Sequence, residues 1–364
     1  MDRLNRLANT LKENQYDSIF ITSKANIYYV SNYYTDPHER LVAVYATKKD
    51  TPLLILPAME KQQALDSGWK GDILSYTDDQ NPWLLFQTYL ADANKYPNTM
   101  AIEKDHISVE RFEYLTKASP ETTIYDAKEL LANLRVIKDK MEYKRLKEAA
   151  SFADLGVKVG IEAIQEGKTE LAILAEIEYK LKKQGIKEMS FSTMVLSGKK
   201  TASPHGNPGL NKISPGDLVL FDLGVIHEGY CSDITRTVAY KQINEEQNQI
   251  YQTVLNAQKE AIGSATKNQS IGTIDKVARD YITNKGYGDY FNHRIGHGIG
   301  IEVHEYPSLT STNDMKLREG MSFTIEPGIY VPNIGGVRIE DEIFITNKGS
   351  ELLTSYPKEL QIIQ

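Results

Sequence analysis

At 364 residues the chain exceeds the usual size of one domain, so two domains are expected. Its net charge of −7 argues against nucleic acid as the main partner, because a phosphate-binding surface needs an excess of Lys and Arg. No apolar run approaches the roughly 18 residues of a membrane span, so no membrane partner is expected, and the stretch 1–11 predicts an amphipathic helix rather than a signal peptide. Cys231 is the single cysteine, which excludes an intramolecular disulfide and favours a cytoplasmic location.

The first part of the chain, 1–125, alternates short apolar runs with helical patterns and predicts an N-terminal α/β domain. Strands are expected at 17–22, 41–45, 52–56 and 99–103, and helices at 2–15, 57–67 and 107–118. No set of catalytic residue types stands out in this part. The loop 36–40 is dense in charge between apolar segments, and its default interpretation is an exposed loop tip.

A change in composition near Asp126 predicts a second domain over 126–364. Apolar residues at helical spacing over 130–150 indicate a long helix, and a capping-box pattern at Thr169 starts another that runs to about Gln184. Further helices are expected at 244–266 and 270–285, and strands at 217–224, 230–238, 322–331 and 337–345, the first two strands forming a hairpin. The second domain is therefore expected to be α+β, with helices against an antiparallel-rich sheet.

Four carboxylates interrupt these apolar strand patterns: Asp222, Asp233, Glu326 and Glu340. An unpaired charge is costly to bury, so each carboxylate needs a cation or a hydrogen-bond network. Taken one at a time, a structural salt bridge explains each of them as well as a metal ion does.

Three of the seven histidines, His293, His297 and His304, lie within twelve residues, with glycines between them. Neutral imidazole is a nitrogen ligand and titrates near pH 7, so such a cluster beside flexible glycines suits metal binding or proton transfer. The alternative is a Gly-rich surface loop with solvated histidines. One histidine combined with the four carboxylates would satisfy two divalent ions, and an oxygen-rich set with one nitrogen suits Mn²⁺, Co²⁺ or Zn²⁺.

The order Asp222, Asp233, His297, Glu326, Glu340 resembles the metal site of the pitta-bread metallopeptidases, which include methionine aminopeptidase, aminopeptidase P and the Xaa-Pro dipeptidases called prolidases. The surrounding phrases are similar too: Cys-Ser-Asp-Ile-Thr-Arg-Thr at 231–237, Gly-His-Gly-Ile-Gly at 296–300, Ile-Glu-Pro-Gly-Ile-Tyr at 325–330 and Gly-Val-Arg-Ile-Glu-Asp at 336–341. The likeness is strong over 126–364 and rests on size and arrangement for the N-terminal domain. It implies a pitta-bread catalytic domain preceded by a smaller, creatinase-like α/β domain.

The resemblance implies a dinuclear metal centre. Asp233 and Glu340 would bridge the two ions, Asp222 would complete one ion, and His297 and Glu326 would complete the other. Mn²⁺ is the expected metal, with Co²⁺ or Zn²⁺ as alternatives. Two ions ~3.5–4 Å apart would share a water molecule and lower its pKa.

The same resemblance implies roles in catalysis. Glu326 would pass a proton from the water to the leaving imino nitrogen, and His205 would help to hold the developing tetrahedral centre. His293 and His304 would line a proline pocket. Arg338 would orient a bridging carboxylate or bind the acid end of the substrate.

The implied function is hydrolysis of Xaa-Pro dipeptides at the bond before proline, by a homodimer. The nearest alternative is an aminopeptidase P-like enzyme that acts on longer peptides. A methionine aminopeptidase usually lacks such an N-terminal domain. Creatinase-like relatives share the fold without this metal set, and non-catalytic peptide-binding relatives typically lose metal ligands, whereas all five are present here.

The N-terminal domain is expected to serve dimerisation and to act as a substrate lid, since a dipeptidase must exclude longer chains. It must also recognise a free carboxylate, which Arg can pair with through two hydrogen bonds. Arg338, Arg294 and Arg40 are the candidates for that contact. The loop 36–40 would reach the active site of the partner subunit, where one of its acidic residues would meet a basic side chain.

Overall fold

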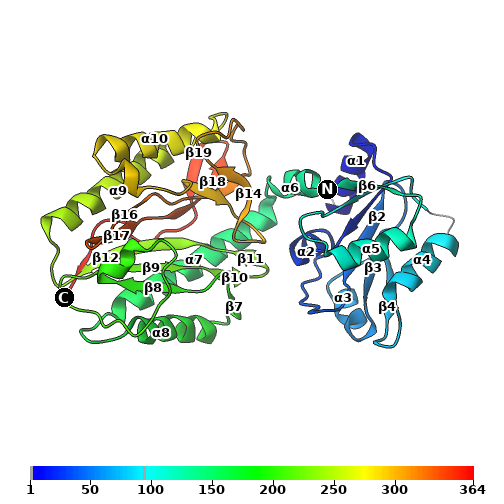
Figure 1. Cartoon of the computed structure of the whole chain (residues 1–364), viewed down its shortest axis with the longest axis horizontal. Helices are drawn as coiled ribbons and strands as arrows, with labels where there is room; N and C mark the ends of the chain where they lie inside the picture. The colour runs from blue at the N-terminus through cyan, green and yellow to red at the C-terminus, as the bar shows by residue number, and fades with distance from the viewer. Residues whose placement is uncertain (1–2, 93–95) are drawn as a thin grey trace. The chain divides into compact units, whose positions relative to one another are not determined.

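The computed structural model describes residues 3–92 and 96–364, and the chain divides into two units, Met1–Arg135 and Val136–Gln364 (Figure 1). Each unit contains β-sheet with helices packed against it, so the mixed fold expected from the sequence is confirmed. No helix in the described ranges is both long enough and apolar enough to cross a membrane.

Unit 1 is built on a six-stranded sheet with the order β4-β3-β2-β1-β5-β6. Its described elements are α1 (Arg3–Glu13), β1 (Ser18–Ile21), α2 (Lys24–Ser31), β2 (Ala43–Thr47), β3 (Leu53–Pro57), η1 (Ala58–Glu60), α3 (Lys61–Asp66), β4 (Asp72–Tyr76), α4 (Pro82–Asp92), β5 (Thr99–Ile102), α5 (Val109–Ala118), β6 (Thr123–Asp126) and α6 (Lys128–Arg135). The sheet is mixed, because β1 pairs antiparallel with β2 and parallel with β5.

The central strand β1 is buried along its whole length, as expected for a strand that is covered on both faces. On one face Phe20 contacts Trp83 and Phe86 of α4. The strands and helices predicted for this half are confirmed. Helix α2 was not predicted, because its side chains are buried nearly all round and give no amphipathic period.

Helix α6 belongs to unit 1. Arg6 Nη2 and Tyr29 Oη each donate a hydrogen bond of 2.8 Å to Leu134 O, which holds α6 against α1 and α2. The division of the chain therefore follows Arg135, later than the boundary expected near Asp126.

Unit 2 contains four sheets, with the strand orders β11-β10-β7, β20-β12-β9-β8, β14-β13-β15-β18-β19 and β16-β17. Its described elements are α7 (Lys140–Glu162), α8 (Glu170–Lys183), β7 (Glu188–Met189), β8 (Met194–Ser197), η2 (Gly198–Ala202), β9 (Leu218–Leu223), β10 (Val225–His227), β11 (Tyr230–Cys231), β12 (Ile234–Tyr240), α9 (Glu245–Ser264), α10 (Ile271–Asn284), η3 (Gly288–Tyr290), β13 (Gly296–Gly298), β14 (Glu305–Leu309), β15 (Ser322–Ile325), β16 (Gly328–Val331), β17 (Gly335–Arg338), β18 (Asp341–Thr346), β19 (Gly349–Leu352) and β20 (Ile362–Ile363). Every described pair except β12 with β20 is antiparallel, which confirms the antiparallel-rich α+β prediction.

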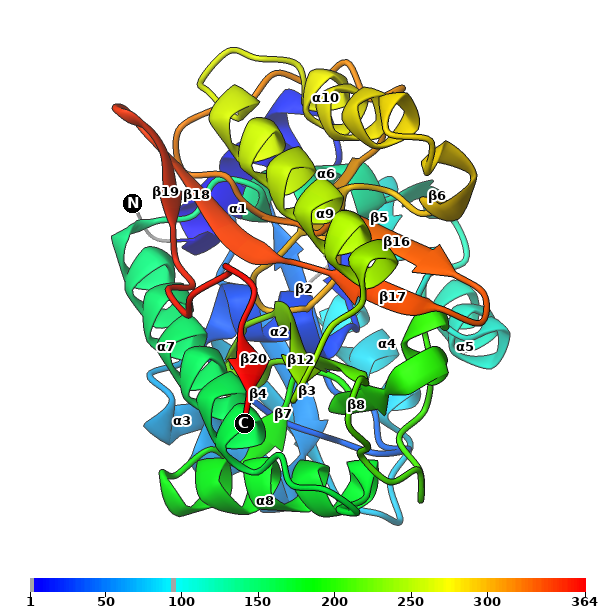
Figure 2. The same ribbon diagram turned by 90° about the vertical axis from the view of Figure 1, so that its left-hand side faces the viewer.

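The helices of unit 2 lie on both sides of its strands. Figures 1 and 2 show α7 and α8 on one side and α9 and α10 on the other. The first pair of helices buries a hydrophobic core with β9 and β12, and the second pair buries a separate core with β15, β17 and β18. Strands from the two cores meet in the middle layer.

Two predicted strands, 322–331 and 337–345, are each divided in the structure. β15 pairs with β18 and β16 pairs with β17, and the two pairs belong to different sheets. Glu326 and Glu340 lie in the two gaps between these pairs, and Asp233 lies in a similar gap between β11 and β12. Expecting these three carboxylates inside strands was therefore wrong.

The gaps arise where the backbone changes its hydrogen-bonding partner. Glu326 N donates to Ile295 O at 2.8 Å, and Glu340 N donates to Thr235 O at 3.1 Å. Both acceptors lie outside the hairpin that carries the two glutamates. The acidic side chains consequently stand where neighbouring sheets meet, rather than along the face of one sheet.

Candidate metal centre

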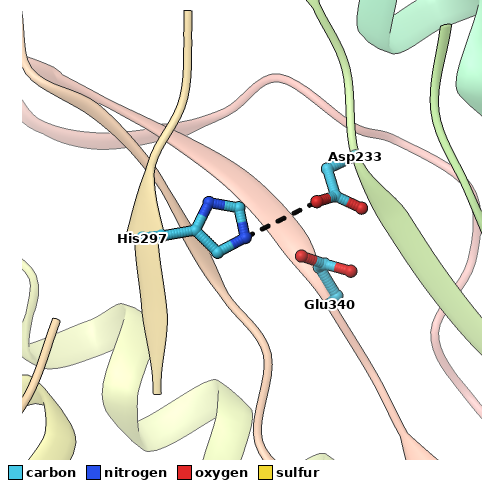
Figure 3. A group of neighbouring side chains, drawn as sticks. All are labelled: Asp233, His297 and Glu340. Carbon is cyan, nitrogen blue, oxygen red and sulfur yellow. Dashed lines mark ion pairs between the residues drawn. The ribbon is translucent and has the colours of Figure 1, made fainter. Parts of the chain in front are cut away.

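Three side chains from three segments converge in Figure 3: Asp233, His297 and Glu340. One ligand atom of each lies within 4.8 Å of those of the other two. His297 Nε2 is 3.6 Å from Asp233 Oδ2 and 3.3 Å from Glu326 Oε1. His297 Nδ1 lies 3.2 Å from Gly298 O, to which it can donate a hydrogen bond. In that tautomer Nε2, the nitrogen that faces the carboxylates, carries no hydrogen and can act as a ligand.

The glycines beside His297 serve close packing. A Cβ added to Gly296 would lie 1.9 Å from Thr324 O, and one added to Gly298 would lie 2.4 Å from Tyr306 O. The neighbouring strands can approach β13 this closely only where no side chain intervenes. The alternative of a Gly-rich surface loop is excluded at these glycines, because Gly296–Gly298 form a strand between β14 and β15.

Several carboxylate oxygens at this point lack hydrogen-bond donors. Asp222 Oδ1, Asp233 Oδ1 and Glu340 Oε1 are buried and accept no hydrogen bond from the described residues. Leaving such a group unsatisfied costs on the order of a few kcal/mol. Divalent cations bind carboxylate oxygens and imidazole nitrogens, so they would satisfy all three oxygens. These side chains therefore fit such ions as ligands.

The carboxylates also raise one another's pKa. Burial, followed by the charge of Glu340, raises the pKa of Asp233 well above its ordinary value. Burial, followed by the charges of Glu326 and Asp222, does the same to the pKa of Glu340. Burial raises the pKa of Glu326 to about 7. A bound divalent ion would oppose these shifts, because nearby positive charge favours the ionised carboxylate.

The three histidines of this region are neutral near pH 7. Burial lowers the pKa of His297 to about 3 and that of His293 to about 4, and burial also lowers the pKa of His304. The rings of His297 and His304 are in edge contact, with centroids 4.2 Å apart. A neutral imidazole can act as a ligand or a hydrogen-bond acceptor, which a protonated one cannot.

The Arg338 guanidinium is surrounded by acceptors. It forms an ion pair with Asp222, and it donates to Tyr330 Oη at 2.8 Å and to Thr235 Oγ1 at 3.1 Å. Thr235 Oγ1 in turn donates to Glu340 Oε2 at 2.7 Å. Arg338 therefore orients Asp222 directly and Glu340 through Thr235.

Tyr330 is a site residue that was not predicted from the sequence. Its hydroxyl accepts the hydrogen bond from Arg338 and lies 3.1 Å from His293 Nε2. The sequence contained one indication of this role. Side chains alternate between the two faces of an extended strand, which places Tyr330 on the same side as Glu326. Because the strand is interrupted between them, that signal was weak.

One cavity of about 880 Å³ gathers the predicted site residues. Those that line it are His205, Asp222, Asp233, His293, Arg294, His297, His304, Glu326, Arg338 and Glu340. Phe191, Met194 and Val303 add an apolar wall that was not predicted. The remaining candidate, Arg40, lies in unit 1 and pairs there with Asp78 at 3.0 Å.

Two family models match the chain. Residues 144–347 match the metallopeptidase family M24, and residues 3–137 match the creatinase/prolidase N-terminal domain. The chain belongs to metallopeptidase family M24. This confirms the resemblance seen in the sequence and the pitta-bread fold with a creatinase-like N-terminal domain. As an M24 member the protein is a hydrolase of the metallopeptidase class, and divalent metal is the cofactor of that family.

The M24 chain is similar to other proteins along its full length. The Bacillus subtilis protein YkvY is 51% identical over 363 residues, which are 100% of both chains. The Xaa-Pro dipeptidase of Lactobacillus delbrueckii subsp. lactis is 41% identical, with 99% of this chain and 98% of the relative covered. The crystal structure of the prolidase from Pyrococcus horikoshii OT3 superposes with a TM-score of 0.91 at 35% identity, covering 99% of this chain and 100% of that one.

Proposed function

We propose that this M24 metallopeptidase is a Xaa-Pro dipeptidase that uses two divalent ions, with Mn²⁺ as the expected metal and Co²⁺ or Zn²⁺ as alternatives. The observation that carries the proposal is the group of buried carboxylate oxygens around His297, in the cavity of unit 2, that accept no hydrogen bond from any part of the chain that the structure describes. The full-length relative named Xaa-Pro dipeptidase supports the choice of substrate.

Five side chains would hold the two ions. They are the four carboxylates Asp222, Asp233, Glu326 and Glu340 and the imidazole of His297, all of which line the cavity. When bound, the ions would lower the pKa of the attacking water and polarise the substrate carbonyl. The side chains around the ions would transfer the proton and position the substrate.

Glu326 would move the proton. It would accept a proton from the attacking water and deliver it to the leaving imino nitrogen. Thr324 Oγ1 donates to Glu326 Oε1 at 3.4 Å, and burial raises the pKa of Glu326 to about 7 in the metal-free protein. The ions that Glu326 would also hold would lower this pKa again, so in the metal-loaded protein Glu326 would be ionised and ready to accept the proton.

Three histidines would position the substrate. His293 Nδ1 lies 2.8 Å from Arg294 O and its Nε2 lies 3.1 Å from Tyr330 Oη, so both ring nitrogens are held. His304 and His205 also line the cavity. We assign His293 and His304 to the proline pocket and His205 to the oxygen of the tetrahedral centre.

Arg294 is a better candidate than Arg338 for binding the substrate carboxylate. The guanidinium of Arg338 is already engaged by Asp222, Tyr330 and Thr235. Among the described residues, Arg294 makes one side-chain hydrogen bond, from Nη1 to Ser308 Oγ at 3.3 Å. Its other nitrogens are therefore available to a carboxylate inside the cavity.

We also propose that the protein is a homodimer formed through its N-terminal unit. The loop 36–40 of that unit would act as a substrate lid. This loop is held in unit 1 by two ion pairs, one between Lys24 and Asp36 and one between Arg40 and Asp78. Such a loop would act as a fixed rim that limits peptide length, rather than as a segment that orders on binding.

The deciding experiment compares a Xaa-Pro dipeptide with the matching Xaa-Pro-Yaa tripeptide on Mn²⁺-loaded protein. We expect a preference for the dipeptide of roughly tenfold or more in kcat/KM, because its free carboxylate meets a cation in the cavity. A dipeptide without proline and the chelated protein serve as controls. Preference for the tripeptide would indicate an aminopeptidase P-like enzyme, and binding of both peptides without cleavage would indicate a peptide-binding relative.

A further inference from the structure

Glu170 is a fully buried carboxylate that the proposed reaction does not use. It follows Thr169, the N-cap of α8, where the sequence predicted a capping box. The capping box is absent, because the third helical residue is Ala172 and carries no group that can reach back to the cap. The Glu170 side chain crosses instead to the segment 197–209.

The Glu170 carboxylate joins the two ends of that segment. Oε1 accepts from Ser197 N at 2.8 Å and from Ser197 Oγ at 3.2 Å. Oε2 accepts from Gly209 N at 2.8 Å and from Lys200 Nζ at 2.6 Å. Four hydrogen bonds to one ionised group in a buried position make a strong anchor.

The segment 197–209 carries His205 into the cavity. The side chain of His205 makes no hydrogen bond or ion pair with the part of the chain that the structure describes, so its place depends on the backbone of the segment. Between the anchored ends, Thr201 Oγ1 accepts from Gly336 N at 2.7 Å, and Pro204 O accepts from Arg338 Nη1 at 3.3 Å.

We infer that Glu170, paired with Lys200, is a positioning residue that fixes the loop presenting His205 to the substrate. The inference rests on the proposed function, which gives His205 its role. Tying both ends of a loop removes conformations that would otherwise be lost when His205 engages the substrate. It also prevents small displacements of the imidazole, and a misplacement of about 1 Å can cost on the order of 10²-fold in rate.

The test is a double-mutant cycle between Glu170→Gln and His205→Ala, with metal content and melting temperature measured for every variant. Glu170→Gln is expected to lower kcat/KM roughly tenfold in the wild-type background but less than about twofold beside His205→Ala. Glu176→Gln is the matched control, because Glu176 lies on the same helix and the substitution removes its ion pair of 2.6 Å with Lys168, which is outside the segment 197–209. Equal losses in both backgrounds, or no loss in either, would overturn the inference.

A second pair of variants keeps Glu170 in place in case Glu170→Gln does not fold. Lys200→Met is expected to show the same dependence on His205 as Glu170→Gln, with a loss of roughly threefold, whereas Lys200→Arg keeps the ion pair and should retain activity. If both variants of Lys200 behave like the wild type, Lys200 takes no part and the paired assignment is overturned.

Hydrogen exchange separates this inference from the proposed function. Amides in 197–209 should exchange faster in Glu170→Gln than in the wild type, and Glu176→Gln should leave them unchanged. A wild-type protein that cleaves no Xaa-Pro peptide would refute the proposed function whatever the exchange shows. Normal wild-type cleavage together with unchanged exchange in Glu170→Gln would overturn the anchoring role alone.

Discussion

Arg338 and Asp222 form an ion pair that occupies Oδ2 of the aspartate and leaves Oδ1 buried, without a hydrogen-bond donor among the described residues. The arginine therefore fixes the orientation of a carboxylate whose second oxygen remains available. Outer contacts of this kind commonly set the geometry and charge of a metal ligand.

Arg338→Met should weaken metal binding and lower kcat, each by roughly 10- to 100-fold, because Asp222 loses its orienting partner. Metal titration by calorimetry and steady-state kinetics on the same preparations would measure both effects. Arg294→Met removes a cation from the same cavity without touching Asp222, and it should retain metal affinity. Unchanged metal affinity in Arg338→Met would show that the ion pair does not shape the ligand.

Asp233→Ala and Glu340→Ala should each abolish activity, with a loss of at least roughly 10³-fold, because each removes an assigned bridge between the ions. Elemental analysis after dialysis should show a lower metal content in both variants. Glu351→Ala, which removes a half-exposed carboxylate paired with Lys147, is the control and should bind metal normally. Full turnover by either bridging variant after chelation would contradict a dinuclear centre.

His293→Ala and His304→Ala should lower kcat severely, by about 10²-fold, while metal content stays nearly unchanged. The reason is that His297 Nε2 lies 3.6 Å from Asp233 Oδ2 and 3.3 Å from Glu326 Oε1, whereas His293 and His304 form no ion pair with a carboxylate in the described residues. Metal analysis beside single-turnover kinetics checks both statements. Loss of one equivalent of metal on mutating His304 would show that the assigned ligand set is wrong.

The stability of the metal-free protein should respond to pH through Glu326. Burial raises the pKa of Glu326 from 4.5 to about 7, so its contribution to stability is complete below 4.5 and is lost as the pH rises through the folded value. Metal-free Glu326→Gln should therefore gain stability relative to the wild type between about pH 5 and about pH 8, by on the order of 2 kcal/mol. Denaturant unfolding of chelated protein at each pH measures this difference.

Glu351 supplies a control of opposite sign for that experiment. Its hydrogen bond with Lys147 lowers the pKa of Glu351, so this carboxylate stabilises the fold above its ordinary pKa and loses that effect as the pH falls. The deficit of Glu351→Gln should shrink toward acid. A pH-independent difference between Glu326→Gln and the wild type would mean that Glu326 ionises normally.

Deletion of 36–40, or Arg40→Ala, should raise KM for a Xaa-Pro dipeptide by roughly tenfold without changing metal content, because the lid would no longer select short substrates. Hydrolysis of the tripeptide should suffer less or improve. Asp78→Ala breaks the same ion pair from its other side, so it separates loss of the Arg40 charge from loosening of the loop. Unaltered dipeptide kinetics after the deletion would remove the lid from the proposal.

The residues of the site could be predicted because charged side chains interrupt apolar sequence patterns there. Asp222, Asp233, Glu326 and Glu340 stand out in apolar segments, and the structure brings all four to one cavity with His297. The strand breaks were not predictable, because they depend on hydrogen bonds between segments far apart in the chain, such as that from Glu340 N to Thr235 O. Hydrophobic periodicity reports local structure and is silent about where a strand changes sheet.

Local patterns also misled where tertiary contacts determine the outcome. The glycines around His297 were also compatible with a Gly-rich surface loop, the alternative weighed for this stretch, but the close approach of neighbouring strands requires them. The Thr169 start of α8 was correct, whereas its expected capping box failed because the third helical residue is Ala172; Glu170, the first helical residue, binds Ser197 and Lys200 instead. The sequence does not show which distant partners a buried side chain such as that of Glu170 will take.

The two hydrophobic cores of unit 2 give the proposed ligand set a mechanical role as well. Asp222 lies in β9 and Asp233 directly precedes β12, two strands packed on α7 and α8, whereas His297 lies in β13 and Glu326 directly follows β15, in the sheet packed on α9 and α10. Ions bound to this set would cross-link the two layers at the point where four acidic groups otherwise repel one another. The two layers would then separate only together with release of the metal. The rate at which a chelator removes the metal would therefore report how often the two layers separate.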